Sequence, residues 1–436
     1  MLHTKKRKVI LLIILISSLV VCVTVLYRDV KAHSDEIYEK LKIFSEVLSI
    51  IQKNYVEETQ SEDLIYGAIK GMLRTLDPHS SFMLPDVYKE LQVETKGSFG
   101  GIGIEITIRK GVLTIVSPIE DTPAFRAGLK AEDKIVKIEG ESTEDMTLFD
   151  AVKKMRGPAG TKVTISIIRE GFVEPEDFTL TREIIRIKSV KHRPLEDNIG
   201  YIRISQFQER TEEEFNKALD ILEQGDEPLR GLILDLRNNP GGLLDQAVKV
   251  CDEFIEQGLI VYTQGRNEAQ QMKFSAHPNK KPHSYPIIAL VNAGSASGSE
   301  IVAGALQDHN RAVVLGSPTF GKGSVQTIIP LEDGSGLRLT TARYYTPLGR
   351  SIQATGIIPD VIVKEKVFHK KEEKKELKFM KEKDLEGHFE PEEAPEDVTL
   401  TEEEEKDIPL ARAIQLLKSW YIFKGLESRN QPISEQ

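Results

Sequence analysis

Hydrophobic positions change their spacing along the chain, and these changes predict three kinds of structure. Between about 35 and 76, apolar residues recur at intervals of three and four, as on the buried face of an amphipathic helix. Between about 97 and 181, short runs rich in Ile and Val are separated by glycines, which predicts strands. From about 199 onward, apolar strands alternate with helical patterns, which predicts a mainly parallel sheet covered by helices.

Three apolar runs of this last region, "LRGLILDLR", "YPIIALV" and "RAVVLGS", resemble strands that are buried on both faces. Each is followed by a segment of small residues: "NNPGG", "NAGSASGSE" and "PTFGKGSVQ". Parallel strands direct their carboxyl ends to one edge of the sheet, where ligands usually bind. We therefore expect the chemistry of this protein in these three segments.

Ser297 is the candidate nucleophile within "NAGSASGSE". Ala296 and Gly298 leave space on both sides of it, and a helix is expected to begin here. The free N–H groups of a helix start favour a developing negative charge, so the N–H of Gly298 is a candidate oxyanion donor. Ser295 and Ser299 are expected to bond the turn and the helix start. A second oxyanion donor could come from "PGG", residues 240–242, since glycines allow close approach of backbone to a ligand.

Two residues could act as the base that removes the proton of Ser297. His309 lies twelve residues further on, in "QDHNR", which is also an ordinary polar helix end. Lys322 lies between Gly321 and Gly323, directly after a buried strand, so it can turn inward. A lysine serves as a base once burial lowers its pKa from about 10.4 towards about 7–8. The sequence favours Lys322, with Ser324 and Gln326 as hydrogen-bonding partners.

These segments together resemble the carboxyl-terminal processing peptidases, which are serine endopeptidases with a Ser-Lys dyad. "LDPHSSF", "FGGIGIEI", "DLRNNPGGLL" and "GRSIQATGIIPDV" match motifs of that family in the family's order. The resemblance implies that Ser297 is the nucleophile, Lys322 the general base and Gln326 the residue that orients the lysine. It also implies that Gly298 and one glycine of the "PGG" turn, Gly241 or Gly242, form the oxyanion hole.

The strand-rich module between 97 and 181 resembles a PDZ domain, which binds an extended peptide by adding it to a sheet edge. "FGGIGIEI" matches the loop that receives a C-terminal carboxylate. The peptide-binding residues expected from it are Gly100, Gly101, Ile102, Gly103 and Ile104. Such a domain could block the active site until a peptide binds, or it could only deliver the substrate, and the sequence leaves both open.

The N-terminal segment predicts the compartment. Four cationic residues, 5–8, precede an uncharged apolar stretch over 9–26, whose length reaches the lower end of the membrane-spanning range. A basic flank favours the cytoplasmic side. We expect an uncleaved anchor, with a removable signal peptide as the alternative. Both alternatives place the rest of the chain outside the cytoplasm, in the cell envelope of a bacterium. An uncleaved anchor would hold it in the inner membrane, and a cleaved signal peptide would release it into the periplasm.

The composition of the chain limits the classes of molecule that it is expected to bind. A net charge of −10 without a basic stripe argues against nucleic acid. Cys22 and Cys251 cannot form a disulfide framework, and the His and Cys residues lack metal-ligand spacing, so neither metal nor cofactor is expected. The expected partners are protein or peptide substrates bound by their C-termini, with an adaptor protein and a homo-oligomer left open.

The expected fold is a multidomain α/β and α+β protein. Its expected parts are a cytoplasmic stub with an anchor or signal segment (1–32), a helical region (33–92), a PDZ domain (93–182), an α/β, crotonase-like peptidase core (183–364), a charged connector (365–406) and a C-terminal helical region (407–436).

The expected function is that of a serine endopeptidase that processes or degrades extracytoplasmic proteins. The alternative is a membrane-tethered PDZ scaffold whose peptidase domain is inactive.

Overall fold

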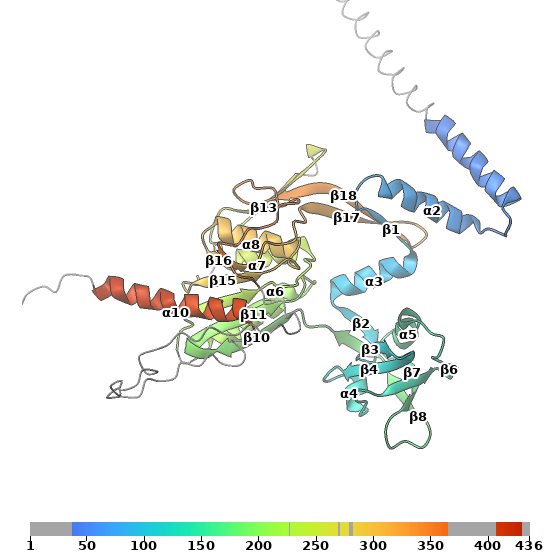
Figure 1. Cartoon of the computed structure of the whole chain (residues 1–436), viewed down its shortest axis with the longest axis horizontal. Helices are drawn as coiled ribbons and strands as arrows, with labels where there is room; N and C mark the ends of the chain where they lie inside the picture. The colour runs from blue at the N-terminus through green and yellow to red at the C-terminus, as the bar shows by residue number, and fades with distance from the viewer. Residues whose placement is uncertain (1–36, 226, 269–270, 279–281, 365–406, 430–436) are drawn as a thin grey trace, which may run out of the picture. The chain divides into compact units, whose positions relative to one another are not determined.

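The computed structural model of the chain describes residues 37–225, 227–268, 271–278, 282–364 and 407–429 (Figure 1). It divides into two compact units, Met1–Phe82 and Met83–Gln436. No helix within the described ranges is long and apolar enough to cross a membrane. The stretch 9–26, expected to be an anchor or signal, and the expected connector 365–406 both lie outside these ranges.

Helices dominate the described part of the first unit, as expected. Residues 37–54 are helical, and α2 spans Ser61–Arg74. The apolar face predicted to be buried is largely exposed: Ile37, Leu41 and Phe44 are 51%, 53% and 43% exposed, and Leu48 and Ile51 are only half-buried. The predicted helix is therefore confirmed, and its predicted burial within the single chain is wrong.

The PDZ-like module lies in the second unit, after helix α3 (Pro85–Lys96). Two helices, α4 (Pro123–Arg126) and α5 (Leu148–Met155), accompany its sheet. The main strands follow the order β3-β4-β5-β7-β8. Their bounds are Ile104–Arg109, Val112–Pro118, Lys134–Ile138, Lys162–Ile168 and Glu176–Thr181. Strands β2 (Ser98–Gly101) and β9 (Glu183–Arg186) pair where the chain enters and leaves the module.

The core sheet has six strands in the order β10-β11-β12-β15-β16-β19. Strand β10 pairs antiparallel, and the other neighbours pair parallel, as the alternating pattern predicted. The bounds are Val190–Leu195, Ile199–Ile204, Gly231–Asp235, Ile287–Val291, Ala312–Gly316 and Val361–Ile362. Because β12, β15 and β16 are neighbours, the segments after them begin side by side.

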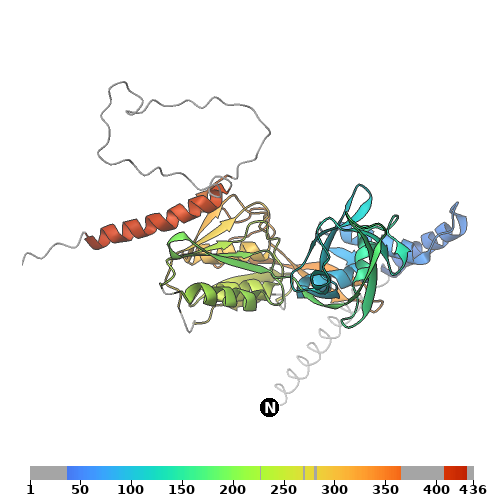
Figure 2. The same cartoon turned by 90° about the horizontal axis from the view of Figure 1, so that it is seen from below.

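Helices cover both faces of this sheet, which explains why its strands are apolar throughout. Leu232 and Leu234 pack in one cluster with α6 (Thr211–Glu223), α7 (Leu244–Asp252) and α8 (Gly298–Asp308). Ile233, between them, packs on the other face with α10 (Ile408–Arg429). Figure 2 shows α6 and α10 on opposite sides of the sheet. The expected terminal helix thus completes a three-layer core.

A second, antiparallel sheet was not predicted. It pairs β17 with β18, β18 with β13 and β13 with β14. These strands span Ser324–Pro330, Gly336–Tyr345, Leu259–Gly265 and Met272–Ser275. Strand β17 begins two residues after Lys322, so this sheet adjoins the expected catalytic residues.

Candidate active site

Three turns at the carboxyl edge of the core sheet carry the predicted catalytic residues. The glycine turn (236–242) follows β12, the serine turn (292–299) follows β15, and the lysine turn (317–323) follows β16. Adjacent turns are joined by hydrogen bonds. The N–H of Ala296 donates to the carbonyl of Asn239 (2.9 Å), and the N–H of Phe320 donates to the carbonyl of Ser295 (3.0 Å).

Ser297 occupies an uncommon backbone conformation, with φ 53° and ψ −110°, directly before α8. A non-glycine residue pays about 1–3 kcal/mol for such a conformation, so surrounding contacts must hold it. The hydroxyl of Ser295 donates to the carbonyl of Leu236, and that of Ser299 donates to the carbonyl of Asn239, both at 2.8 Å. The expected turn-bonding roles of these two serines are confirmed, and Ser297 alone faces the cleft.

Gly298 begins α8 and is buried against neighbours on both sides. A Cβ there would lie 3.0 Å from the Phe207 ring and 3.4 Å from Ala247. As the first residue of a helix, Gly298 has no intrahelical acceptor for its N–H. This free N–H lies next to Ser297, which agrees with its predicted role as an oxyanion donor.

The two glycines of the glycine turn differ in what they can offer. Both have positive φ, 102° at Gly241 and 140° at Gly242. A Cβ on Gly241 would lie 2.7 Å from the Cβ of Ser297, so any other residue would displace the nucleophile. However, the N–H of Gly241 already donates to Oδ1 of Asn239 (2.9 Å). Gly242, in contrast, lines the cleft and is the better donor candidate.

Lys322 is half-buried and lines the same cleft as Ser297. Burial, followed by the positive charge of Arg338 on β18, lowers the pKa of its ammonium group, while Glu300 opposes the shift. A lowered pKa increases the neutral fraction that can accept a proton. Within the described residues no hydrogen bond joins Ser297 to Lys322, and such catalytic contacts often tighten only with substrate bound.

Glu300, which the sequence interpretation missed, links the two predicted catalytic residues. Its side chain is fully buried in α8. One carboxylate oxygen accepts the N–H groups of Ser297 (2.8 Å) and Lys322 (2.9 Å). The other accepts the N–H of Gly321 (2.7 Å) and the hydroxyl of Thr319 (2.6 Å). A single buried anion therefore fixes the serine and lysine turns relative to each other.

The expected orienting residue, Gln326, and the alternative base, His309, are placed differently. Gln326 lines the cleft, and its amide donates to the hydroxyl of Ser324 (2.8 Å), not to Lys322. His309 is the C-cap of α8, and its Nε2 lies 2.7 Å from the carbonyl of Leu259. It is not among the residues that line the cleft with Ser297.

The cleft itself has a volume of about 610 Å³. Its walls come from α3, the glycine turn, the start of α7 and strands β14, β17 and β18. The residues that line it with Ser297, Lys322 and Gln326 include Leu91, Glu94, Phe207, Gly242, Leu244, Asp245, Met272, Phe274, Val325, Arg338 and Tyr344. Apolar side chains and polar or charged side chains line the cleft in about equal number, so it offers both hydrophobic contacts and hydrogen-bonding groups.

The PDZ-like module has a groove between the loop before β3 and helix α5. Gly101, Ile102, Gly103 and Ile104 line it together with residues of α5. Gly100 lies outside this groove, and its carbonyl accepts the N–H of Gly157 (3.0 Å). Ile102 is only 2% exposed and packs in the module's core, so Ile104 is the better candidate to contact a ligand side chain.

Comparison with family models gives three matches. Residues 198–363 match peptidase family S41, residues 114–169 match the PDZ domain, and residues 23–86 match the activating protease CtpB N-terminal domain. The first match contains all three turns of the site.

Similar proteins cover most of the chain. A carboxy-terminal-processing protease of Bartonella bacilliformis is 49% identical over 75% of this chain and 76% of its own. A carboxyl-terminal-processing protease of Synechocystis is 40% identical over 72% and 75%, respectively. Among solved structures, a photosystem II D1 C-terminal processing protease is 31% identical and covers 74% of this chain and 92% of its own, with a TM-score of 0.43.

Replacing Glu300 by Gln should reduce kcat for peptide cleavage about a hundredfold. The NH2 group of the glutamine cannot accept the N–H bonds that one carboxylate oxygen accepts now, so the serine turn and the lysine turn would no longer be held together. Glu213→Gln, in an exposed ion pair with Lys217, is the matched control and should leave kcat unchanged. A Glu300→Gln variant with normal kcat would contradict the linking role.

Replacing Arg338 by Met should raise the pKa of Lys322, because one of the two causes of its depression is removed. A lysine acts as a base only in its neutral form, so with Lys322 in that role the acid limb of the kcat/KM profile should move to higher pH. Arg343, exposed on the same strand, provides the control Arg343→Met. Identical profiles for both variants would show that Arg338 does not tune the lysine.

Proposed function

Since this chain belongs to the carboxy-terminal processing proteases of peptidase family S41, and is a serine peptidase, we propose that it cleaves with a Ser297–Lys322 dyad. The observation that carries the proposal is the shared cleft: Ser297 and Lys322 both line it, and Glu300 bonds the backbone of both. The lowered pKa of Lys322 supports its role as base, and the position of His309 outside the cleft favours lysine over histidine.

In the proposed reaction, neutral Lys322 accepts the hydroxyl proton as Ser297 attacks the peptide carbonyl. The N–H groups of Gly298 and Gly242 bind the oxyanion. Lys322 then donates its proton to the leaving amine, and water hydrolyses the acyl-enzyme. Gln326 is proposed to orient the lysine during this cycle. Its side chain would turn away from Ser324, and its amide oxygen would accept a hydrogen bond from the ammonium group of Lys322.

The substrate is proposed to be a protein that the PDZ domain binds by its C-terminus. The groove beside Gly101–Ile104 supports this role, because N–H groups of a glycine-rich loop can receive a carboxylate. Ile104 would contact the last apolar side chain. The chain N-terminal to the bound end would then run towards Ser297 as an extended strand.

The protein is proposed to act in the bacterial envelope, outside the cytoplasm. The basic residues 5–8 and the uncharged stretch 9–26 support an inner-membrane anchor or a cleaved signal. A homo-oligomer is proposed from the exposed apolar residues of the helix over 37–54 and from Trp420 on α10. Cell fractionation and light scattering of the full chain check these two proposals.

Ser297→Ala and Lys322→Ala should each reduce cleavage of fluorescent casein by at least about 10⁴-fold, with the melting temperature retained. His309→Ala is the control and should keep kcat near that of the wild type. Retained cleavage in purified Ser297→Ala or Lys322→Ala would refute the dyad. Loss in His309→Ala with retention in Lys322→Ala would point to histidine as base.

A peptide ending in an amide should be cleaved with a kcat/KM roughly tenfold or more below that of the same peptide with a free carboxylate, because charge-assisted hydrogen bonds are lost. Equal values would argue against recognition of C-termini. A second experiment distinguishes the two possible roles of the PDZ domain. Cleavage of a substrate at an internal site is measured with and without an added free C-terminal peptide. Faster cleavage with the peptide indicates that the PDZ domain switches the active site on, and an unchanged rate indicates that it only delivers the substrate.

A further inference from the structure

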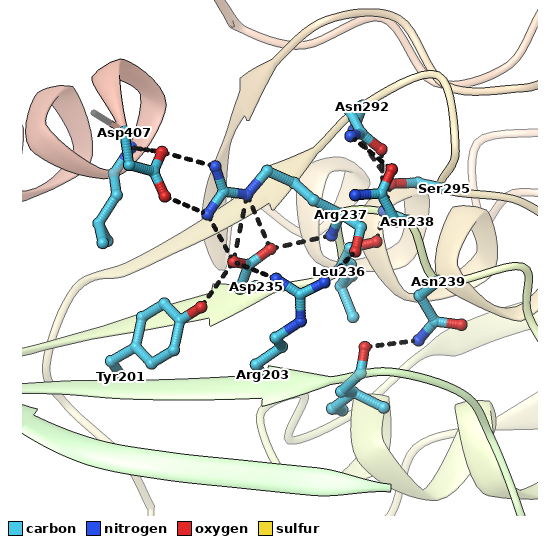
Figure 3. Close-up of polar contacts among 12 residues, drawn as sticks. Tyr201, Arg203, Asp235, Leu236, Arg237, Asn238, Asn239, Asn292, Ser295 and Asp407 are labelled. Carbon is cyan, nitrogen blue, oxygen red and sulfur yellow. Dashed lines mark hydrogen bonds and ion pairs between the residues drawn. The ribbon is translucent and has the colours of Figure 1, made fainter. Parts of the chain in front are cut away.

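Asp407, directly before α10, reaches back to the glycine turn. Its carboxylate accepts two hydrogen bonds from the guanidinium of Arg237: Nη1 to Oδ1 at 2.7 Å and Nη2 to Oδ2 at 2.8 Å (Figure 3). Oδ1 also accepts the N–H of Leu410, so the same carboxylate caps α10. The two partners are separated by 170 positions in the chain.

Arg237 is buried, with 9% of its side chain exposed, and it is shared between two carboxylates. Its Nε and Nη2 donate to Asp235 at 3.0 and 2.7 Å. Burial alone would lower the pKa of the guanidinium, but the bonds to Asp407 and Asp235 hold this pKa well above its ordinary value. A buried charge is stable only when it is paired and hydrogen-bonded.

The cluster around Arg237 is balanced in charge. Asp235 is fully buried at the end of β12, and besides Arg237 it accepts the hydroxyl of Tyr201 (2.7 Å) and lies 3.7 Å from Arg203. Figure 3 shows these groups converging on one carboxylate. Two arginines therefore face two aspartates, and removal of the Asp407 charge leaves a partly buried excess of one positive charge.

The backbone of Arg237 belongs to the glycine turn. Its neighbour Asn238 donates its N–H to Asn292 (2.9 Å), and Asn239 accepts bonds from Ala296 and Ser299. The guanidinium thus fixes the start of the turn that ends at Gly242. Nothing else in the described part of the C-terminal segment contacts this turn through a hydrogen bond or ion pair.

We propose that Asp407 is a positioning residue for peptide hydrolysis: by clamping Arg237 it holds the glycine turn where Gly242 can bind the oxyanion beside Ser297. The inference rests on the proposed Ser297 dyad and adds to it. Its consequence is that the C-terminal segment is a component of the active site, although it supplies no group that touches the substrate.

The helix α10 has other attachments, which allow the clamp to be tested separately. Leu410, Ala413 and Leu417 pack on the core sheet, and the hydroxyl of Tyr421 donates to the carbonyl of Arg230. Asp407→Asn should therefore leave α10 docked. Tyr421→Phe is the matched control, since it removes one polar contact of α10 that does not reach the glycine turn.

The experiment compares full-length wild type, Asp407→Asn, Tyr421→Phe and Ser297→Ala. It measures kcat, KM, the melting temperature, and inhibition by a peptide aldehyde and by the same peptide as an unreactive amide. With the aldehyde, Ser297 Oγ bonds to the carbonyl carbon, its proton passes to Lys322, and the carbonyl oxygen becomes the oxyanion. Aldehyde inhibition therefore depends on the oxyanion hole, whereas amide binding does not.

Asp407→Asn should lower kcat and aldehyde affinity by about ten- to a hundredfold, with KM and amide binding within about twofold of the wild type. Tyr421→Phe should match the wild type. Wild-type kcat and aldehyde affinity in Asp407→Asn, with Ser297→Ala inactive, would overturn the clamp and leave the dyad standing. Cleavage by Ser297→Ala would instead refute the proposed function.

If Asp407→Asn lowers the melting temperature more than Tyr421→Phe does, the same measurements are made with Asp407→Glu. This variant keeps the charge and displaces the carboxylate by one methylene group. A reduced kcat with normal amide binding supports the clamp, and a normal kcat in this folded variant with its displaced carboxylate overturns it.

Discussion

The hydrogen bonds between the glycine turn and the serine turn are the constraint on which the rest of the site depends. They exist because β12 and β15 are parallel neighbours, so both turns leave the sheet at one edge. The carbonyls of Leu236 and Asn239 then become acceptors for the serines that flank Ser297. These contacts hold Ser297 in a backbone conformation that it would not otherwise keep, and they bring the glycine turn to its side.

Two buried charged groups extend this arrangement in opposite directions. Glu300 lies in the first turn of α8 and accepts N–H groups from the serine turn and from the lysine turn. Arg237 lies at the start of the glycine turn and is held by carboxylates from β12 and from the residue before α10. Each group forms several hydrogen bonds to protein partners, which is the condition for keeping a charge out of water. The catalytic turns are thus fixed by electrostatics as well as by the sheet.

Much of the fold and the positions of Ser297 and Lys322 could be predicted from the sequence, because the signals are local: apolar strands, small residues after them, and glycines around a lysine. The role of Glu300 could not, since it depends on contacts with Gly321 and Lys322, which lie 21 and 22 residues further along the chain. The commitment of the Gly241 N–H to Asn239 depends on a side-chain rotamer, so Gly241 and Gly242 were indistinguishable. The second sheet was missed because its two hairpins, β13–β14 and β17–β18, lie far apart in the chain and become one sheet only through the pairing of β13 with β18. Asp407 lies at the end of a charged run. No feature of the neighbouring sequence distinguishes a carboxylate exposed to solvent from one that pairs with a buried arginine, so its role could not be predicted.

The place of Asp407 in the chain gives the order in which the site is completed during synthesis. Ribosomes make Ser297 and Lys322 well before they make Asp407, which follows Ser297 by 110 residues (407 − 297). Until Asp407 is made, Arg237 can pair only with Asp235, and one face of the core sheet lacks α10, the helix that covers it. The nascent chain therefore carries Ser297 and Lys322 before it carries Asp407, the residue whose carboxylate joins the start of α10 to the glycine turn.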